Sequence, residues 1–442
     1  MNNIKNNLLT HTWHPCMQMK SFEKNPPLQI KSACGPWLYL QDGRKIFDAI
    51  SSWWCKSLGH NHPQIKAAIA KQMDQFEHVI FANTSYKTIE LLSEKLTNLM
   101  PNFNKVFFTG DGACSIEVAL KMSLQAMQIK GKSNKNQFLS LENSYHGDTA
   151  GAISISDVGK FKQPFEKLTF KTHTLKNLPY ITGTNDPLWH NIEHLWPNYL
   201  AQLEPLKENL AAIIIEPVVQ GAGGIKIYSP DLIKRLSLWC KKNDIYLIAD
   251  EIMTGIGRTG TMSACEHANI EPDFACYSKG LTSGWMAFSA CVTTDEVYNL
   301  FYSDNIEKAF LHSHTYSGNA LAASAALETL KIMYNLNICK HVTQNINPIL
   351  QATLDKLNPK FFYNTRSIGA IAAFDIKPQY QKILSQITQK LAQKKLGVLI
   401  RPINNTIYWM PPLNSSINEL NSMLKVCNNM FIAQTSDYYC FS

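Results

Sequence analysis

The sequence contains no run of about eighteen apolar residues, so it offers no candidate for a membrane-spanning helix. Its N-terminal stretch, MNNIKNNLLTHTWHP, is polar and lacks the apolar core of a signal peptide. The 42 basic and 34 acidic residues are interspersed, and no long block carries charges of one sign. These absences argue against a membrane protein, a secreted protein and a protein with a nucleic-acid-binding tail.

The eleven cysteines include no C-x-x-C pair and show no regular spacing. In a chain of 442 residues this usage is typical of reduced thiols in a cytoplasmic protein rather than of a disulfide framework. There is no internal repeat and no low-complexity tract. The length and the 45% hydrophobic content predict a large domain with a sizeable core and a second, smaller domain. The net charge of +8 indicates an ordinary solvated surface, although a mildly basic surface could also favour anionic ligands.

Short apolar runs alternate with helix-period stretches from about residue 61 onward. This pattern predicts an α/β fold with a mostly parallel sheet that is covered on both faces. The stretch 160–210 contains several prolines, among them Pro164, Pro179, Pro187 and Pro197, and predicts long loops, and the end of the chain predicts a strand at 406–410. A hairpin is expected around 41–44. The expected buried strands are 105–108, 211–215, 245–249 and 274–277, and the expected helices are 64–79, 88–99, 115–130 and 319–335.

Two of the expected strands are followed by charged side chains. The strand 245–249 ends in Asp250 and Glu251, and the strand 274–277 is followed by Ser278, Lys279 and Gly280. Ligands of open parallel sheets bind beyond the carboxyl ends of the strands. A carboxylate and a lysine on neighbouring strand ends suit a cofactor with a ring nitrogen at one end and an aldehyde at the other. Taken singly, Asp250 could instead be a helix cap or part of an ion pair, and Lys279 could lie in a surface loop.

Two glycine-containing turns also follow strands. Gly110-Asp111-Gly112-Ala113 precedes the helix expected from Cys114 and predicts a phosphate site at a helix N-terminus. The stretch 255–260 matches G-x-G-x-x-G, but five residues, including the acidic pair, separate it from its strand. A dinucleotide site is therefore not expected there. His312 and His314 form an H-x-H pattern without a third ligand, so no metal site is expected.

Over nearly its whole length the sequence resembles the class III (subgroup II) aminotransferases, which are fold-type I pyridoxal-phosphate enzymes. The resemblance is carried by ordered motifs: Glu216-Pro217, 220–224, 249–251, 255–260, 278–281 and 312–319. It implies a seven-stranded, mainly parallel sheet in a large domain of residues 61–335. A smaller α+β domain would combine residues 1–60 with 336–442. It also implies a cytoplasmic homodimer with shared active sites.

The resemblance assigns roles to individual residues. Lys279 would be the Schiff-base lysine and proton shuttle, Asp250 would pair with the pyridine nitrogen, and Tyr145 would stack on the ring. Gly112 and Ala113 would hold the phosphate together with Ser313, His314 and Thr315 of the second subunit. Trp53, Ser313 and Arg401, with Lys279, would contact substrate, and Arg401 would receive a carboxylate. Asp148 and Arg258 could bind or simply brace the site.

Four features resemble the branch of the family that transfers an amino group from S-adenosylmethionine to 8-amino-7-oxononanoate in biotin synthesis. They are 51–54 (SSWW), 59–63 (GHNHP), 144–148 (SYHGD) and Arg401-Pro402 followed by 408–412 (YWMPP). Three positions depart from the family pattern. Cys16 stands where a substrate-contacting tyrosine is usual, Ala113 lacks a common hydroxyl, and His314 replaces a proline.

Two other functions remain possible on the sequence. The first is a class III ω-aminotransferase with another donor, such as lysine, ornithine or 4-aminobutyrate, against which the tryptophan pair and the 408–412 motif argue. The second is a non-enzymatic basic nucleic-acid-binding protein, which would bind oligonucleotides in a salt-dependent way and carry no coloured cofactor.

Overall fold

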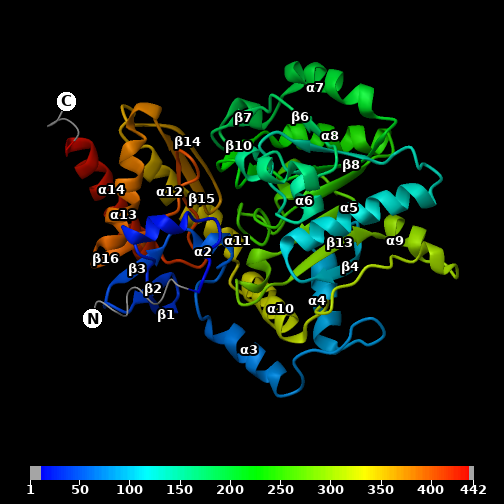
Figure 1. Cartoon of the computed structure of the whole chain (residues 1–442), viewed down its shortest axis with the longest axis horizontal. Coiled ribbons are helices and arrows are strands. Elements are labelled where there is room, and N and C mark those ends of the chain that lie inside the picture. The colour runs from blue at the N-terminus through cyan, green and yellow to red at the C-terminus, as the bar shows by residue number, and fades with distance from the viewer. Residues whose placement is uncertain (1–10, 438–442) are drawn as a thin grey trace.

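A seven-stranded sheet lies at the centre of the larger part of the computed structural model, which describes residues 11–437 (Figure 1). Only β13 runs antiparallel to its neighbours, so the sheet is mainly parallel, as the sequence predicts. In spatial order the strands are β4 (Phe103–Thr109), β13 (Ser289–Thr294), β12 (Phe274–Tyr277), β11 (Tyr246–Asp250), β8 (Leu210–Ile215), β5 (Gln137–Leu141) and β6 (His173–Leu175).

The central strands are buried because apolar side chains cover both faces of the sheet. Along β8, Ile213 and Ile215 pack into one hydrophobic cluster, whereas Ala212 and Ile214 pack into another. Alternate residues of a strand point to opposite faces, so the two clusters are the two layers of core. Continuous apolar runs such as 210–215 are the sequence signature of this double burial.

Helices cover both layers. Helix α5 (Gly112–Ile129) contributes Ile116 and Val118 to one cluster, and α8 (Pro230–Lys242) contributes Leu232 and Leu236 to the other. The remaining helices before residue 336 are α2 (Ser51–Trp54), α3 (Pro63–Met73), α4 (Lys87–Thr97), α6 (Ala150–Ile155), α7 (Trp196–Leu203), α9 (Asp295–Phe301) and α10 (Ala320–Asn335).

The N-terminal and C-terminal parts of the chain lie side by side (Figure 1, blue and orange). One sheet has the order β1-β2-β3-β16, and its strands β3 and β16 pair in parallel although they lie far apart in the sequence. The domain boundaries at 60 and 335 remain a prediction. The strands are β1 (Ile30–Cys34), β2 (Trp37–Leu40), β3 (Lys45–Asp48) and β16 (Leu396–Leu399), and a second sheet contains β14 (Phe362–Ile368), β15 (Ile371–Ile376) and β17 (Thr406–Trp409). The helices of this part are α11 (Ile338–His341), α12 (Asn347–Leu354), α13 (Lys382–Gln393) and α14 (Ile417–Asp437).

All four predicted buried strands are present, and the predicted hairpin joins β2 to β3. The helix expected over 64–79 ends at Met73, and the helix expected from Cys114 begins at Gly112. The stretch 160–210 is less open than predicted, because it contains β6, β7 (Tyr180–Ile181) and α7 between short 3-10 turns. Strand β7 pairs with β10 (Lys226–Tyr228), which also pairs with β9 (Val219–Gln220).

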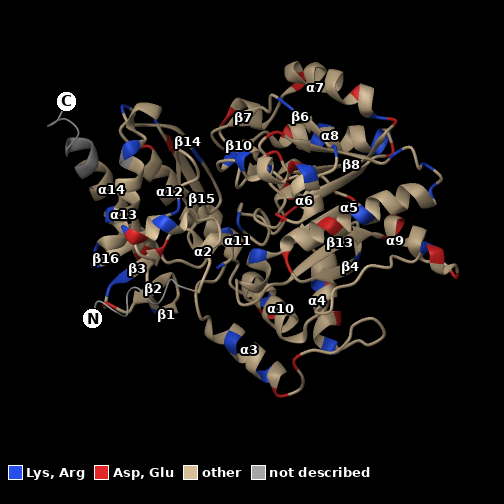
Figure 2. Cartoon of the chain, viewed as in Figure 1, with Lys and Arg blue, Asp and Glu red and all other residues tan. Residues whose placement is uncertain are grey.

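Lys and Arg are spread over both parts of the molecule and alternate with Asp and Glu (Figure 2). Across residues 11–437, no helix is both long and apolar enough to cross a membrane. The same residues contain no group of three or more His, Cys, Asp or Glu side chains arranged to hold a metal ion.

Candidate active site

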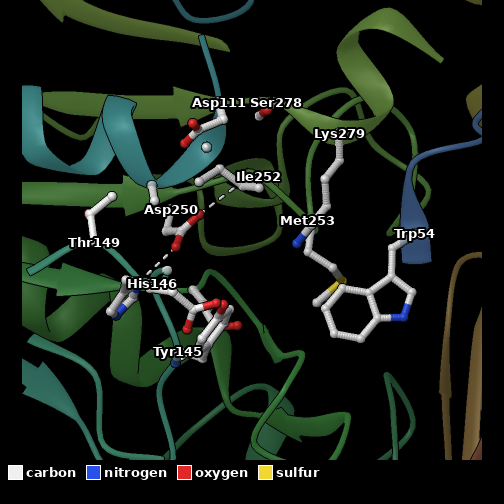
Figure 3. Close-up of a pocket in the computed structure, with 15 residues that line it drawn as sticks. Trp54, Asp111, Tyr145, His146, Thr149, Asp250, Ile252, Met253, Ser278 and Lys279 are labelled. Atoms are coloured by element: carbon white, nitrogen blue, oxygen red, sulfur yellow. Dashed lines mark hydrogen bonds and ion pairs between the residues drawn. The ribbon is translucent and has the colours of Figure 1, made fainter. Parts of the chain in front are cut away.

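A cavity of about 460 Å³ lies at the carboxyl ends of the central strands (Figure 3). Cavities of this size can enclose a small organic ligand. Apart from Trp54, which belongs to α2, its lining residues lie at or after the ends of strands of this sheet: Trp54, Asp111, Gly112, Ala113, Tyr145, His146, Gly147, Asp148, Thr149, Glu216, Asp250, Ile252, Met253, Ser278 and Lys279.

Asp250 is the last residue of β11 and is almost fully buried. Its Oδ1 accepts a hydrogen bond from the Ile252 amide at 3.1 Å. Its Oδ2 lies 2.7 Å from Nδ1 of His146, which is also buried. A carboxylate is retained at such a place only when polar or cationic partners compensate its burial. Asp250 is therefore fixed in direction and remains able to pair with a cationic ligand.

Lys279 follows β12, the strand next to β11, so the topology brings it into the same cavity as Asp250. Its Nζ lies 4.7 Å from the centroid of the Trp54 ring. Burial lowers the pKa of the amine, while Asp250 and Glu216 act in the opposite direction. Its φ of 43° is in the left-handed region, which a non-glycine residue adopts at an energetic cost. Burial thus favours the neutral amine, which is available as a nucleophile. The surrounding structure must compensate the strain of the left-handed backbone at Lys279.

The predicted phosphate turn lies at the start of α5. Gly112 and Ala113 line the cavity, and the amides of a first helical turn have no acceptor within the helix. Asp111 also lines the cavity, and its carboxylate caps the helix by accepting from the Cys114 amide at 3.0 Å. Gly147 packs directly against this turn, since a Cβ there would lie 2.5 Å from Cβ of Ala113. Gly147 has a φ of 131°, which glycine adopts more readily than other residues do.

Tyr145 lines the cavity through a loop that Glu216 holds in place. The Tyr145 amide donates to Oε2 of Glu216 at 3.0 Å, and the Gly221 amide donates to Oε1 at 2.8 Å. Burial, and secondarily Asp148, raises the pKa of the Tyr145 phenol far above its ordinary value. The ring is therefore a neutral aromatic face, and Asp148 lies beside it.

Two ionisable residues of the site, Glu216 and His146, have no role predicted from the sequence. Glu216 directly follows β8 and is almost fully buried. Its pKa is raised to about 7, because burial and the nearby Asp250 together outweigh the lowering by His146 and by the two amide hydrogen bonds. The strand-end signal that identified Asp250 applies equally to Glu216, so this carboxylate could have been found. The contact of His146 with Asp250 depends on the path of the 144–148 loop and has no comparable signal.

The predicted substrate residues Trp53 and Arg401 stack on each other outside the cavity lining, with 4.3 Å between the guanidinium carbon and the ring centroid. Arg401 also donates to the backbone oxygen of Cys16 at 3.2 Å. Cys16 therefore lies next to Arg401, but its side chain is exposed to solvent. The indole that lines the cavity is that of Trp54.

Ser313, His314 and Thr315 do not line the cavity of their own subunit. The backbone oxygen of Thr315 is bonded to His78 Nε2 at 2.8 Å, and the His314 amide donates to Ser317 Oγ at 3.3 Å. The flanking side chains are open to solvent in the single chain, with Leu311 80% and Tyr316 65% exposed.

Arg258, within the G-x-G-x-x-G stretch, is buried and donates to the backbone oxygens of Ala370 at 3.3 Å and Pro411 at 2.7 Å. It does not line the cavity. A Cβ at Gly257 would lie 2.4 Å from the Met333 side chain, so this glycine serves close packing. In this structure the stretch braces the two parts of the chain against each other.

The Aminotransferase class-III family model matches residues 19–431. The adenosylmethionine-8-amino-7-oxononanoate aminotransferase of Helicobacter pylori is 41% identical over 410 residues, covering 91% of this chain and 92% of the relative. The protein of the same name from Synechococcus elongatus is 36% identical, covering 93% and 96%.

Solved structures agree with these sequence matches. The crystal structure of the protein of that name from Methanocaldococcus jannaschii superposes with a TM-score of 0.88 at 31% identity, covering 98% of this chain and 99% of that one. A PLP-bound amine transaminase from an uncultivated Pseudomonas species superposes with a TM-score of 0.85 at 27% identity, covering 96% and 98%.

Proposed function

The chain belongs to the class-III aminotransferases, and we propose that it transfers the amino group of S-adenosylmethionine to 8-amino-7-oxononanoate. The product would be 7,8-diaminononanoate, an intermediate of biotin synthesis. The two substrates are those in the printed names of the relatives. The observation that carries the proposal is that Asp250 and Lys279 share one cavity with a helix N-terminus.

The cavity fits pyridoxal phosphate. The first turn of α5 offers amides to a phosphate, Asp250 offers a carboxylate to a protonated ring nitrogen, and Lys279 offers an amine to an aldehyde. Tyr145 offers an aromatic face. When bound, the cofactor supplies an aldehyde that captures amines and a ring that accepts electrons from the substrate carbon.

The residues of the chain then have separate tasks. Lys279 would carry a proton on and off Nζ, for which its lowered pKa is suited. Asp250 would pair with the ring nitrogen and keep it protonated, and His146 fixes the direction of the carboxylate. Trp54 covers the amine and keeps water from it. Arg401 receives the carboxylate that both substrates carry, because its planar guanidinium suits bidentate pairing.

We further infer that the active enzyme is a homodimer. Ser313, His314 and Thr315 lie away from their own cavity, in a segment whose Leu311 and Tyr316 are exposed. A second copy that covered this segment would bury the apolar side chains and bring the three residues to the partner's phosphate turn. The protein would work in the cytoplasm, in line with the ten free cysteines among residues 11–437.

The donor is tested by adding S-adenosylmethionine, lysine or glutamate separately to the purified enzyme and recording its visible absorbance. S-adenosylmethionine should remove the band of the lysine-bound cofactor. If lysine removes the band and S-adenosylmethionine at the same concentration does not, the donor assignment is wrong while the aminotransferase assignment survives.

The dimer is tested by mixing two inactive variants, Lys279→Ala and Thr315→Ala combined with His314→Ala. Shared sites predict that mixed dimers contain one complete site and regain activity. Failure of the mixture to regain activity, with heterodimers isolated through a different affinity tag on each variant, would contradict shared sites.

A further inference from the structure

Residues Ser51 to Trp54 (α2) form a helical turn of the left hand. Their φ values are 48°, 45°, 70° and 73°, and none of the four is glycine. The Trp54 amide donates to the Ile50 oxygen at 2.8 Å and the Cys55 amide to the Ser51 oxygen at 2.9 Å, so the turn is closed as a helix is. L-residues adopt this conformation singly, at a cost that corresponds to about fivefold to thirtyfold in population per residue. Four in succession require strong support from the surroundings.

Three side-chain hydrogen bonds provide that support. Ser51 Oγ donates to the Met410 oxygen at 2.6 Å, Trp54 Nε1 to the Tyr408 hydroxyl at 3.2 Å, and Ser52 Oγ to Oδ2 of Asp48 at 2.6 Å. The first two tie the turn to β17 and the residue after it. The third ties it to a carboxylate at the end of β3.

Asp48 is a fully buried carboxylate that does not line the cavity. Its Oδ2 also accepts from His60 Nε2 at 2.8 Å. Its Oδ1 has no hydrogen-bond partner within the described part of the chain. Burial lowers the pKa values of Lys56 and Arg258, and Asp48 is near enough to oppose that lowering slightly. A buried carboxylate with one bare oxygen is costly, and replacement by an apolar residue would cost the fold less. Its two hydrogen-bond partners are His60 and Ser52, and Ser52 is the one that belongs to the turn.

The turn aims two consecutive indoles at the two ends of the substrate site. Trp54 lies against the amine of Lys279 (Figure 3), and Trp53 lies against the guanidinium of Arg401. A right-handed turn would send these side chains in other directions, because the side-chain positions follow the hand of the helix. The hand of this one turn thus sets the shape of the wall that substrates meet.

We propose that Asp48 is a positioning residue which, through Ser52, holds the left-handed turn and thereby determines how tightly substrates bind against Trp53 and Trp54. This role for Asp48 rests on the proposed function, because only that function makes Trp53 and Trp54 the wall of a substrate site. Asp48 acts only through the turn, so its loss should weaken substrate binding rather than the chemical step.

The decisive comparison is between Ser52→Ala and Ser52→Gly. Both remove the hydroxyl that reaches Asp48, but only glycine adopts positive φ without strain. We expect Ser52→Ala to raise KM for the donor by about tenfold, as expected for a turn that has lost its support, and to change kcat far less. Ser52→Gly should keep KM within about threefold of the parent enzyme. Asp48→Leu, which removes the acceptor oxygen, should resemble Ser52→Ala, and adding Ser52→Gly to it should recover most of the lost binding.

A merely structural role for Asp48 predicts that all variants have a lower melting temperature and less active enzyme. Their KM for the donor would then equal that of the parent enzyme. That result, or equal KM values for Ser52→Ala and Ser52→Gly, would overturn the proposal. If Asp48→Leu does not fold, the serine pair alone decides. The kinetics use whichever donor reacts with the parent enzyme. If that donor is not S-adenosylmethionine, the proposed function fails separately from this inference.

Discussion

Two neutralising substitutions at adjacent residues should have different effects. Asp250→Asn should reduce activity, whereas Glu251→Gln should reduce stability. Asp250 faces the cavity, whereas Glu251 faces the protein interior. Glu251 accepts from Ser263 Oγ at 2.5 Å, Thr254 Oγ1 at 2.7 Å and the Cys265 amide at 3.0 Å. It thereby closes the turn that follows β11, and it touches nothing in the cavity.

The magnitudes follow from these contacts. An asparagine at 250 cannot hold a ring nitrogen protonated, and loss of such an electrostatic partner typically costs about 3 kcal/mol in the barrier, or roughly a hundredfold in kcat. A glutamine at 251 keeps one acceptor oxygen but weakens charge-assisted hydrogen bonds to neutral ones. We expect a loss of about 1–3 kcal/mol in the free energy of unfolding, because neutral hydrogen bonds are worth about half as much.

The assay is steady-state kinetics beside thermal denaturation for both variants. Asp250→Asn should lose activity with a nearly unchanged melting temperature, and Glu251→Gln should lose melting temperature with kcat within a few-fold of the parent. Equal small activity losses in both variants would refute the role given to Asp250. A Glu251→Gln enzyme with parental stability would refute the structural role given to Glu251.

Three further outcomes are expected. Lys279→Ala should leave the protein folded but abolish turnover and the visible band of the lysine-bound cofactor, and a variant with near-parental turnover would disprove the assignment. Cys16→Tyr should be tolerated and should change KM for the oxononanoate more than it changes the donor half-reaction, because Arg401 contacts only the backbone of Cys16; separate half-reaction kinetics measure this, and collapse of the donor half-reaction alone would contradict it. Burial raises the pKa of Asp273 from its ordinary 3.8 to about 6, so the folded protein holds this proton more tightly than the unfolded chain and loses stability as pH rises between these values. Asp273→Asn, which can still accept from the Leu247 amide, should therefore raise Tm at about pH 8 but not at about pH 4, and an equal change at both would reject the explanation.

The sequence predicted the parts of the fold that depend on local patterns. Runs such as 210–215 and 245–249 are apolar throughout, and only a doubly covered strand buries such a run. Strands β5 (QFLSL) and β13 (SACVTT) were missed because they mix serine, threonine or glutamine with apolar residues. Their place in the sheet is decided by tertiary packing rather than by periodicity.

In the candidate site too, local sequence patterns predicted some residues and not others. Asp250 and Lys279 could be placed together because both follow parallel strands, and the ends of neighbouring parallel strands meet at one edge. The contact of His146 with Asp250, and the cavity position of Trp54 rather than Trp53, depend on a loop and on a left-handed turn. Sequence patterns specify neither, because the conformations are imposed by partners distant in the sequence, such as Tyr408 and Met410 for the turn.

The pairing of β3 with β16 determines when the N-terminal sheet can form during synthesis. Residues 45–48 leave the ribosome early, but their partners at 396–399 are separated from them by most of the chain. At 5–20 residues per second, the wait is roughly 20–70 s. Throughout that time the β3 edge, which bears Asp48 and leads into the left-handed turn, lacks its final neighbour. The aromatic wall of the site should therefore be among the last features of the nascent enzyme to form, and contacts so distant in sequence make slow folding the expectation.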